Sequence, residues 1–193
     1  HRENRNKMLN LVRNFKMNKS DRCLDLFCYL GAWGFHLLKD GFFFVDFVDQ
    51  ANLKQQISDT TTLNKFKNNG EFYQDNSFNF IDKKISDDTK YKIICSDPPA
   101  FTKTATKIKE ALEGYSRLHQ KLMKILDCGS LLFIGSCTHY ISLEDLDNTV
   151  KIAAQKNNRK VKLLEIGIQG LDHPISSLSS KGNYIKFLAY YVH

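Results

Sequence analysis

Hydrophobic residues follow two alternating patterns along this chain. Short apolar runs rich in aromatic and β-branched residues predict buried strands. Longer stretches in which apolar residues recur every three or four positions predict amphipathic helices. The predicted strands cover 23–27, 42–48, 71–74, 91–96, 130–136, 161–168 and 184–192. The predicted helices cover 3–17, 33–39, 51–66, 77–84, 107–126 and 143–156.

This alternation of strands and helices predicts an α/β fold. We expect one domain over residues 1–193, with a mostly parallel seven-stranded sheet, helices on both faces and a Rossmann-like arrangement. The last two predicted strands have no room for a helix between them, so we expect an antiparallel hairpin at one sheet edge. Ligands bind beyond the carboxyl ends of the strands in such sheets. Polar residues at those ends are therefore the candidates for a site.

The first two strands each end near an acidic residue. Asp25 lies inside an apolar run shortly before Gly31, where the backbone can turn tightly and expose helix N-terminal amides. Together they are suited to the amino-acid end of a cofactor, although an aspartate that only binds loop amides is equally compatible. Asp49 follows the second strand at a spacing that favours ribose hydroxyls over a helix-capping role. The chain has no phosphate-binding glycine motif.

The next two strands end in further polar groups. Asp75 and Asn76 follow the third strand, where they suit either an adenine amino group or a simple turn. Asp97-Pro98-Pro99-Ala100-Phe101 follows the fourth strand. Its two prolines stiffen an extended backbone and hold Asp97 at the sheet edge. We favour a functional role for this segment over a strand terminator.

Cys137 follows the fifth strand and should reach the same edge as the three aspartates. A thiolate there can attack a pyrimidine ring, with Lys103 or His139 as the cation that lowers the cysteine pKa. A buried structural cysteine is the alternative. The basic run at Lys103, Lys107 and Lys109, near Phe101, suits a nucleic-acid backbone beside a stacking surface, or a solvated helix start. Asp172-His173-Pro174 is more typical of a turn than of a site.

Charge and cysteine content narrow the environment. The net charge of +7 and the pI of about 9.1 suit a polyanionic partner such as RNA, although many basic proteins bind none. The five cysteines form no C-x-x-C pair, so we expect no metal and no disulfide framework, and a reducing cytoplasm. No apolar run is long enough to cross a membrane. The sequence leaves the oligomeric state open, a homodimer included.

These motifs, in this order, resemble a known family. The chain is similar to the class I methyltransferase domain of bacterial 23S ribosomal RNA cytosine-C5 methyltransferases, whose full-length members usually carry an N-terminal PUA domain. No PUA-like region is visible, so we expect a catalytic domain that lacks an upstream RNA-binding domain. The resemblance is carried by Arg2-Glu3-Asn4-Arg5, Asp25 to Gly34, Val48-Asp49-Gln50, Asp97 to Phe101, Gly114-Tyr115, Ser136-Cys137, Asp172-His173-Pro174 and Tyr184-Ile185-Lys186.

The resemblance implies S-adenosylmethionine as cofactor, S-adenosylhomocysteine as product, and RNA, with ribosomal RNA favoured, as partner. It implies Cys137 as the nucleophile at cytosine C6 and Asp97 as the group that orients the base. The implied cofactor-binding residues are Asp25, Phe27, Tyr29, Gly31, Asp49, Gln50, Asn76, Asp97 and Pro98. The implied substrate-binding residues are Pro99, Phe101, Lys103 and His173.

Two positions depart from the family pattern. Asn76 stands where relatives often have Asp at the adenine, and Leu30 replaces a small polar residue. These departures keep a non-catalytic nucleotide- or RNA-binding module open as an alternative. A methyltransferase acting on an exocyclic base nitrogen is the other, although Ala100 separates the diproline from the aromatic residue.

Overall fold

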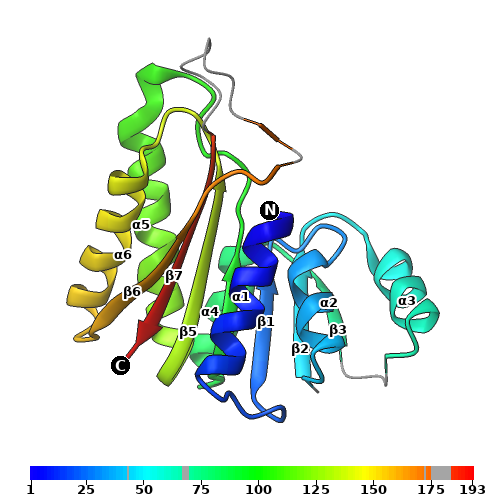
Figure 1. The fold of residues 1–193 in the computed structure, drawn as a ribbon. Helices are drawn as coiled ribbons and strands as arrows, with labels where there is room; N and C mark the ends of the chain where they lie inside the picture. The colour runs from blue at the N-terminus through cyan, green and yellow to red at the C-terminus, as the bar shows by residue number, and fades with distance from the viewer. Residues whose placement is uncertain (43, 67–69, 172, 175–183) are drawn as a thin grey trace.

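The computed structural model describes residues 1–42, 44–66, 70–171, 173–174 and 184–193. Seven strands form one sheet in the order β3-β2-β1-β4-β5-β7-β6 (Figure 1). The first five strands are parallel, whereas β7 pairs antiparallel with both β5 and β6. The expected α/β fold with an antiparallel pair at one edge is therefore confirmed.

The predicted elements lie close to their observed bounds. The strands are β1 (Arg22–Leu26), β2 (Phe44–Asp49), β3 (Gly70–Gln74), β4 (Tyr91–Ser96), β5 (Leu126–Cys137), β6 (Val161–Gly167) and β7 (Ile185–Val192). The helices are α1 (Arg2–Asn14), α2 (Ala32–Lys39), α3 (Lys54–Leu63), α4 (Ser77–Ser86), α5 (Ile108–Ile125) and α6 (Leu143–Lys156), with a 3-10 turn at Ala105–Lys107. The largest difference is the early start of β5, which follows α5 without a loop.

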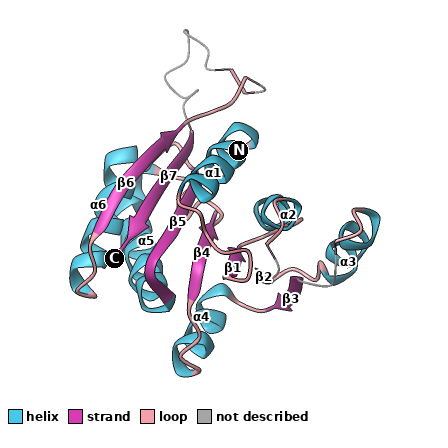
Figure 2. Ribbon diagram, turned by 60° about the horizontal axis from the view of Figure 1, so that its bottom comes forward, coloured by secondary structure: helices cyan, strands magenta, loops and turns pink. Residues whose placement is uncertain are grey.

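Helices cover both faces of the sheet (Figure 2). Each face has its own hydrophobic core. The core under α4, α5 and α6 includes Phe80, Tyr115 and Leu146. The core under α1, α2 and α3 includes Met8, Leu37 and Ile57. The strands between the two cores are apolar on both sides, which explains their continuous apolar runs.

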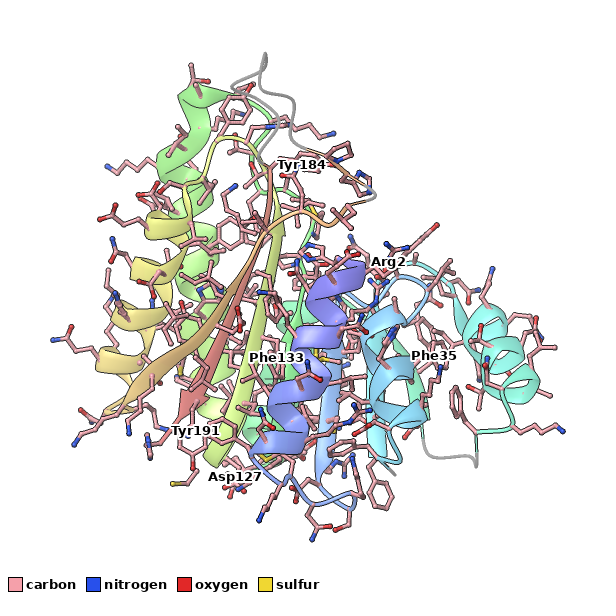
Figure 3. All side chains as sticks on the ribbon, in the orientation of Figure 1. Arg2, Phe35, Asp127, Phe133, Tyr184 and Tyr191 are labelled. Carbon is pink, nitrogen blue, oxygen red and sulfur yellow. The ribbon has the colours of Figure 1, made fainter. Side chains whose placement is uncertain are left out.

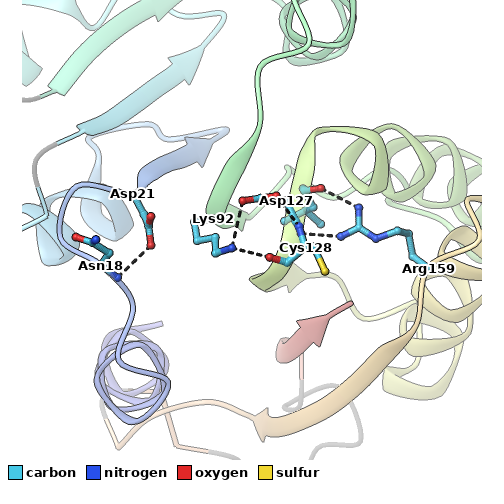
Figure 4. Close-up of polar contacts among 7 residues, drawn as sticks. Asn18, Asp21, Lys92, Asp127, Cys128 and Arg159 are labelled. Carbon is cyan, nitrogen blue, oxygen red and sulfur yellow. Dashed lines mark hydrogen bonds and ion pairs between the residues drawn. The ribbon is translucent and has the colours of Figure 1, made fainter.

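Arg159 binds backbone carbonyl groups at the end of the sheet opposite the carboxyl ends of the parallel strands (Figure 4). Its guanidinium donates to the carbonyl oxygens of Leu126 and Asp127 at 2.8 and 2.6 Å, and to that of His193 at 2.7 Å. One arginine thereby joins the start of β5 to the residue after β7.

The five cysteines are all free thiols, as expected. Cys23, Cys28 and Cys95 are buried, whereas Cys128 and Cys137 are exposed. Among the described residues, no helix is both long and apolar enough to span a bilayer.

Candidate functional site

The carboxyl ends of the parallel strands bring the predicted polar residues to one edge. Register pairs Leu26 of β1 with Val48 of β2 and with Ser96 of β4, so the residues after these strands are neighbours. Ser96 in turn pairs with Ile134 of β5, three residues before Cys137. Figure 3 shows Arg2 and Tyr184 at this end of the molecule and Asp127 and Tyr191 at the other.

A pocket of about 490 Å³ opens at this edge. This volume lies in the range of small-molecule sites. Ten residues line it: Phe27, Tyr29, Asp49, Gln50, Asn76, Ser77, Phe78, Asp97, Pro99 and Phe101. Six of the nine predicted cofactor residues are among them, but Asp25, Gly31 and Pro98 are not. Ser77 and Phe78 line the pocket without having been predicted.

The loop between β1 and α2 forms one wall of the pocket. Its backbone has positive φ at Phe27 (61°), Tyr29 (48°) and Gly31 (74°). Left-handed conformation at a non-glycine residue costs about 1–3 kcal/mol and is typical of functional loops. Asp49 holds this loop, because its Oδ2 accepts from the Tyr29 amide at 2.9 Å. Its Oδ1 accepts from the Ala51 amide at 2.9 Å, so Asp49 binds loop amides and still faces the pocket.

Asp25 is buried behind this loop, with 1% of its surface exposed. Its Oδ2 accepts from the Gly34 amide in the first turn of α2 at 2.8 Å. Its Oδ1 has no hydrogen-bond partner among the described residues. Burial raises the pKa of this carboxyl well above its usual range, and the hydrogen bond from Gly34 only partly opposes that. Asp25 thus binds a backbone amide, as its alternative role requires, and its other carboxyl oxygen is buried without a partner among the described residues.

Asn76 precedes α4 and is its N-cap residue. Its Oδ1 accepts from the amides of Phe78 at 3.0 Å and Asn79 at 3.4 Å. The oxygen that was expected to meet an adenine amino group is therefore already engaged by the helix. Asp75 forms an ion pair with Lys83 at 2.7 Å.

Asp97 lies at the junction between the pocket and Cys137. Trp33 Nε1 donates to its Oδ2 at 3.3 Å. Burial raises the pKa of the Asp97 carboxyl, and the Trp33 hydrogen bond opposes the rise. Gly135 of β5 leaves room for this side chain, because a Cβ there would lie 2.6 Å from Asp97 Cγ.

Cys137 ends β5 within 4.8 Å of a carboxylate oxygen of Asp97. Desolvation and the nearby Asp97 charge raise the pKa of the thiol to about 11, and the α-ammonium group of His1 and then Lys186 oppose the rise. The prediction that Lys103 or His139 supplies this cation is wrong, since Lys186 lies on β7 beside Cys137. His1 Nε2 lies 3.4 Å from Cys137 Sγ, a contact that was not predicted.

The predicted substrate residues separate into two groups. Phe101 lines the pocket and packs on Tyr115 with ring centroids 4.5 Å apart, in space left by Gly114. Pro99 lines the pocket and is exposed. Lys103 and His173 are exposed and do not line it; His173 Nδ1 lies 3.3 Å from the Tyr184 hydroxyl. Asp172 lies outside the described residues.

A second hollow of about 560 Å³ crosses the outer face of α5. Four of the seven residues that line it are Arg117, Lys121, Lys124 and Lys156. None of the described residues that line it is acidic, although Lys121 pairs with Asp82. Phe78 lines both this hollow, here called the basic groove, and the pocket.

Proteins with curated names match most of this chain, whereas no protein-family model matches it. The Photobacterium profundum protein named ribosomal RNA large subunit methyltransferase I is 31% identical over 176 residues, which are 89% of this chain and 44% of that protein. The Aliivibrio fischeri protein of the same name is 29% identical over 182 residues, covering 92% and 45% respectively. The chain therefore spans less than half the length of these relatives.

Solved structures share the fold. A crystal structure described as a candidate methyltransferase complexed with SAH superposes with a TM-score of 0.79 at 19% identity, over 94% of this chain and 48% of that one. A SAM-dependent methyltransferase from Agrobacterium tumefaciens gives 0.69 at 14% identity, over 97% and 62%. With the observed strand order, these likenesses identify the fold as the Rossmann-like class I methyltransferase fold.

Proposed function

We propose that this chain is the catalytic domain of an S-adenosylmethionine-dependent methyltransferase that forms 5-methylcytosine in large-subunit ribosomal RNA. The observation that carries the proposal is the position of Asp97. Its side chain lines the pocket, and a carboxylate oxygen also lies within 4.8 Å of Cys137 Sγ. A cofactor in the pocket and a base at Cys137 would therefore meet at one carboxylate.

The pocket fits the proposed cofactor in its chemistry. Asp49 and Gln50 offer acceptors suited to ribose hydroxyls, and Phe78 offers an apolar wall for a flat base. The amino-acid end would meet the left-handed loop from Phe27 to Gly31, above the unpartnered Asp25 Oδ1. When bound, S-adenosylmethionine supplies an electrophilic methyl group.

Cys137 and Asp97 would carry the remaining chemistry. The Cys137 thiolate adds to C6 of a cytosine, which makes C5 nucleophilic enough to take the methyl group. The methyl group would leave its sulfonium sulfur, with S-adenosylhomocysteine as product, and C5 would then lose its proton to water. The Cys137–C6 bond would break in the same step, which restores the aromatic ring and the thiolate. Asp97 would hold the ring nitrogen during the addition. The target base must leave its stack to reach this edge.

An RNA substrate is supported by charge and by the names of the relatives. The chain carries a net charge of +7, and the basic groove concentrates four cations beside Phe78. Polyanion binding through such cations is largely independent of sequence. Choice of the target nucleotide would then depend on Pro99 and Phe101 at the edge of the pocket. Lys103 and His173, the other two predicted substrate-binding residues, would add contacts outside it. A cytoplasmic location stays a prediction that suits this substrate.

Methyl transfer from labelled cofactor to ribosomal RNA, followed by nucleoside analysis, tests the proposal. We expect label in 5-methylcytosine with the wild-type chain and none with Cys137→Ala. Calorimetry should show unchanged S-adenosylhomocysteine binding in this variant. Cys128→Ala, at the other end of β5, is the matched control and should keep full activity.

The two alternatives give different outcomes in the same experiment. Label on an exocyclic nitrogen, with undiminished activity in Cys137→Ala, would favour the N-methyltransferase. Absence of binding by either S-adenosylmethionine or S-adenosylhomocysteine would leave only the non-catalytic binding module.

A further inference from the structure

The side chain of His1 lies in the proposed reaction centre, beside Cys137 and Asp97. The side chain is only 7% exposed, and its ring lies 5.5 Å from that of Trp33. Nε2 lies 3.4 Å from Cys137 Sγ and 3.7 Å from Asp97 Oδ2. One ring nitrogen therefore faces the proposed nucleophile and its neighbouring carboxylate.

The other ring nitrogen faces Asn4, which determines where the imidazole carries its proton. Asn4 Nδ2 lies 3.1 Å from His1 Nδ1 and 3.1 Å from the carbonyl oxygen of Ile168. A carbonyl oxygen can only accept, so the Asn4 atom beside it must be the NH₂ group. That group then donates its second hydrogen to His1 Nδ1. Because Nδ1 accepts, the proton of the neutral imidazole is on Nε2.

The rest of the structure holds Asn4 in this orientation. Asn4 is 1% exposed, and Gly167 leaves the room it occupies, since a Cβ there would lie 2.9 Å from Asn4 Cγ. A reversed amide would place Oδ1 against the Ile168 carbonyl oxygen, two acceptors facing each other. Asn4 Oδ1 has no hydrogen-bond partner among the described residues, so only the NH₂ group orients the amide.

We propose that His1 is a positioning residue for Cys137, whose Nε2–H donates to the sulfur and stabilises it as the thiolate, with Asn4 fixing the tautomer. A hydrogen bond from a neutral donor helps the thiolate without adding a charge beside Asp97. The other charged or titratable groups around Cys137 are the α-ammonium group of His1, Asp97 after β4, Lys186 from β7 and Tyr115 from α5. Of these the α-ammonium group and Lys186 favour the thiolate, and Lys186 Nζ already donates to the Thr138 carbonyl at 2.6 Å. The importance of the bond for methyl transfer rests on the proposed function, but the bond itself can be tested without it.

Alkylation of Cys137 by iodoacetamide measures the thiolate directly, because only the thiolate reacts. The chain is expressed with an initiator methionine before His1, and the rate at each cysteine is followed by peptide mass spectrometry from pH 7 to 11. His1→Phe keeps an aromatic ring against Trp33 but removes the donor. We expect Cys137 to react about 10 to 100 times more slowly in this variant at a given pH, the effect of one hydrogen bond to a charged sulfur.

Two controls separate hydrogen bonding from packing. His1→Gln carries an amide NH₂ that can donate to the sulfur, and should restore most of the rate lost in His1→Phe. The rate at exposed Cys128 should be the same in all variants. Equal rates at Cys137 in wild type and His1→Phe would overturn the proposal.

Nitrogen-15 NMR of the unaltered chain tests the tautomer without any substitution. We expect the chemical shifts of a protonated Nε2 and an unprotonated Nδ1 for His1, and the opposite pattern would contradict the role given to Asn4. If the alkylation and NMR results are as expected but no 5-methylcytosine is formed, the proposed function fails while this inference stands. If 5-methylcytosine forms and His1→Phe has no effect, only the inference fails.

Discussion

The side chain of Asp97 occupies the space that the missing side chain of Gly135 leaves on the neighbouring strand. A Cβ at Gly135 would lie 2.6 Å from Asp97 Cγ and 3.0 Å from Asp97 Cβ, so the two residues have to be considered together. Glycine at this point of β5 is explained by a close approach rather than by backbone conformation.

We expect Gly135→Ala to reduce methyl transfer about 10- to 100-fold, because the added methyl group would push the carboxylate away from Cys137. Single-turnover kinetics with labelled cofactor would measure this loss. The substitution should have little further effect in an Asp97→Ala background, where the carboxylate is already absent. If the losses in methyl-transfer rate from the two single substitutions multiply in the double variant, Gly135 does not act through the Asp97 carboxylate.

Phe78 should contribute to cofactor binding. It lines the pocket two residues after Asn76, the N-cap of α4, and a flat base against its ring would gain about 0.5–1.5 kcal/mol beyond area burial. We expect Phe78→Ala to weaken S-adenosylhomocysteine binding roughly tenfold by calorimetry. Phe15→Ala is the control, since Phe15 stacks on Tyr191 away from the pocket. Equal affinities in wild type and Phe78→Ala would remove this residue from the site.

Sequence reasoning predicted the alignment of Asp25, Asp49, Asp97 and Cys137 because parallel strands bring their carboxyl ends to one edge. It missed Phe78, since an aromatic residue in the first turn of an amphipathic helix is expected in the core. It missed His1 because the contact with Cys137 joins residues 136 positions apart. It also named the wrong cation for Cys137, because Lys186 approaches only through the antiparallel pairing of β5 with β7.

The basic groove should contribute to RNA affinity through phosphate contacts. Replacing Arg117, Lys124 and Lys156 by Gln removes three positive charges from its lining. The plot of log affinity against log salt concentration should become less steep by about 2, since each lost contact with single-stranded RNA contributes about 0.7. Fluorescence anisotropy with a labelled RNA fragment would measure it.

The control for this variant is the triple replacement of Lys39, Lys54 and Lys162 by Gln. It changes the net charge equally, but these three exposed lysines lie outside the groove. If both triple variants lose the same slope, the effect is one of net charge and the groove has no special role. Binding of S-adenosylhomocysteine should be unchanged in both.

His119 should make the protein less stable in mild acid. Burial lowers the pKa of its imidazole to about 3 from an ordinary value of 6.5, and its Nδ1 lies 3.0 Å from Thr149 Oγ1. Thr149 Oγ1 donates to the Leu146 carbonyl at 2.6 Å, so it accepts from Nδ1–H and leaves Nε2 without a partner among the described residues. A proton on Nε2 would therefore be buried and unpaired.

Between these two pKa values the unfolded chain binds a proton at His119 that the folded chain does not. The free energy of unfolding should consequently fall by about 1.4 kcal/mol for each pH unit below about 6.5, in addition to the effect of the carboxylates. His119→Asn keeps an N–H donor for Thr149 but cannot be protonated in this range. Urea unfolding at pH 7, 6, 5 and 4 should show that the free energy of unfolding falls more steeply with decreasing pH in the wild type than in this variant. Parallel curves would mean that His119 is protonated in the folded protein, contrary to its burial.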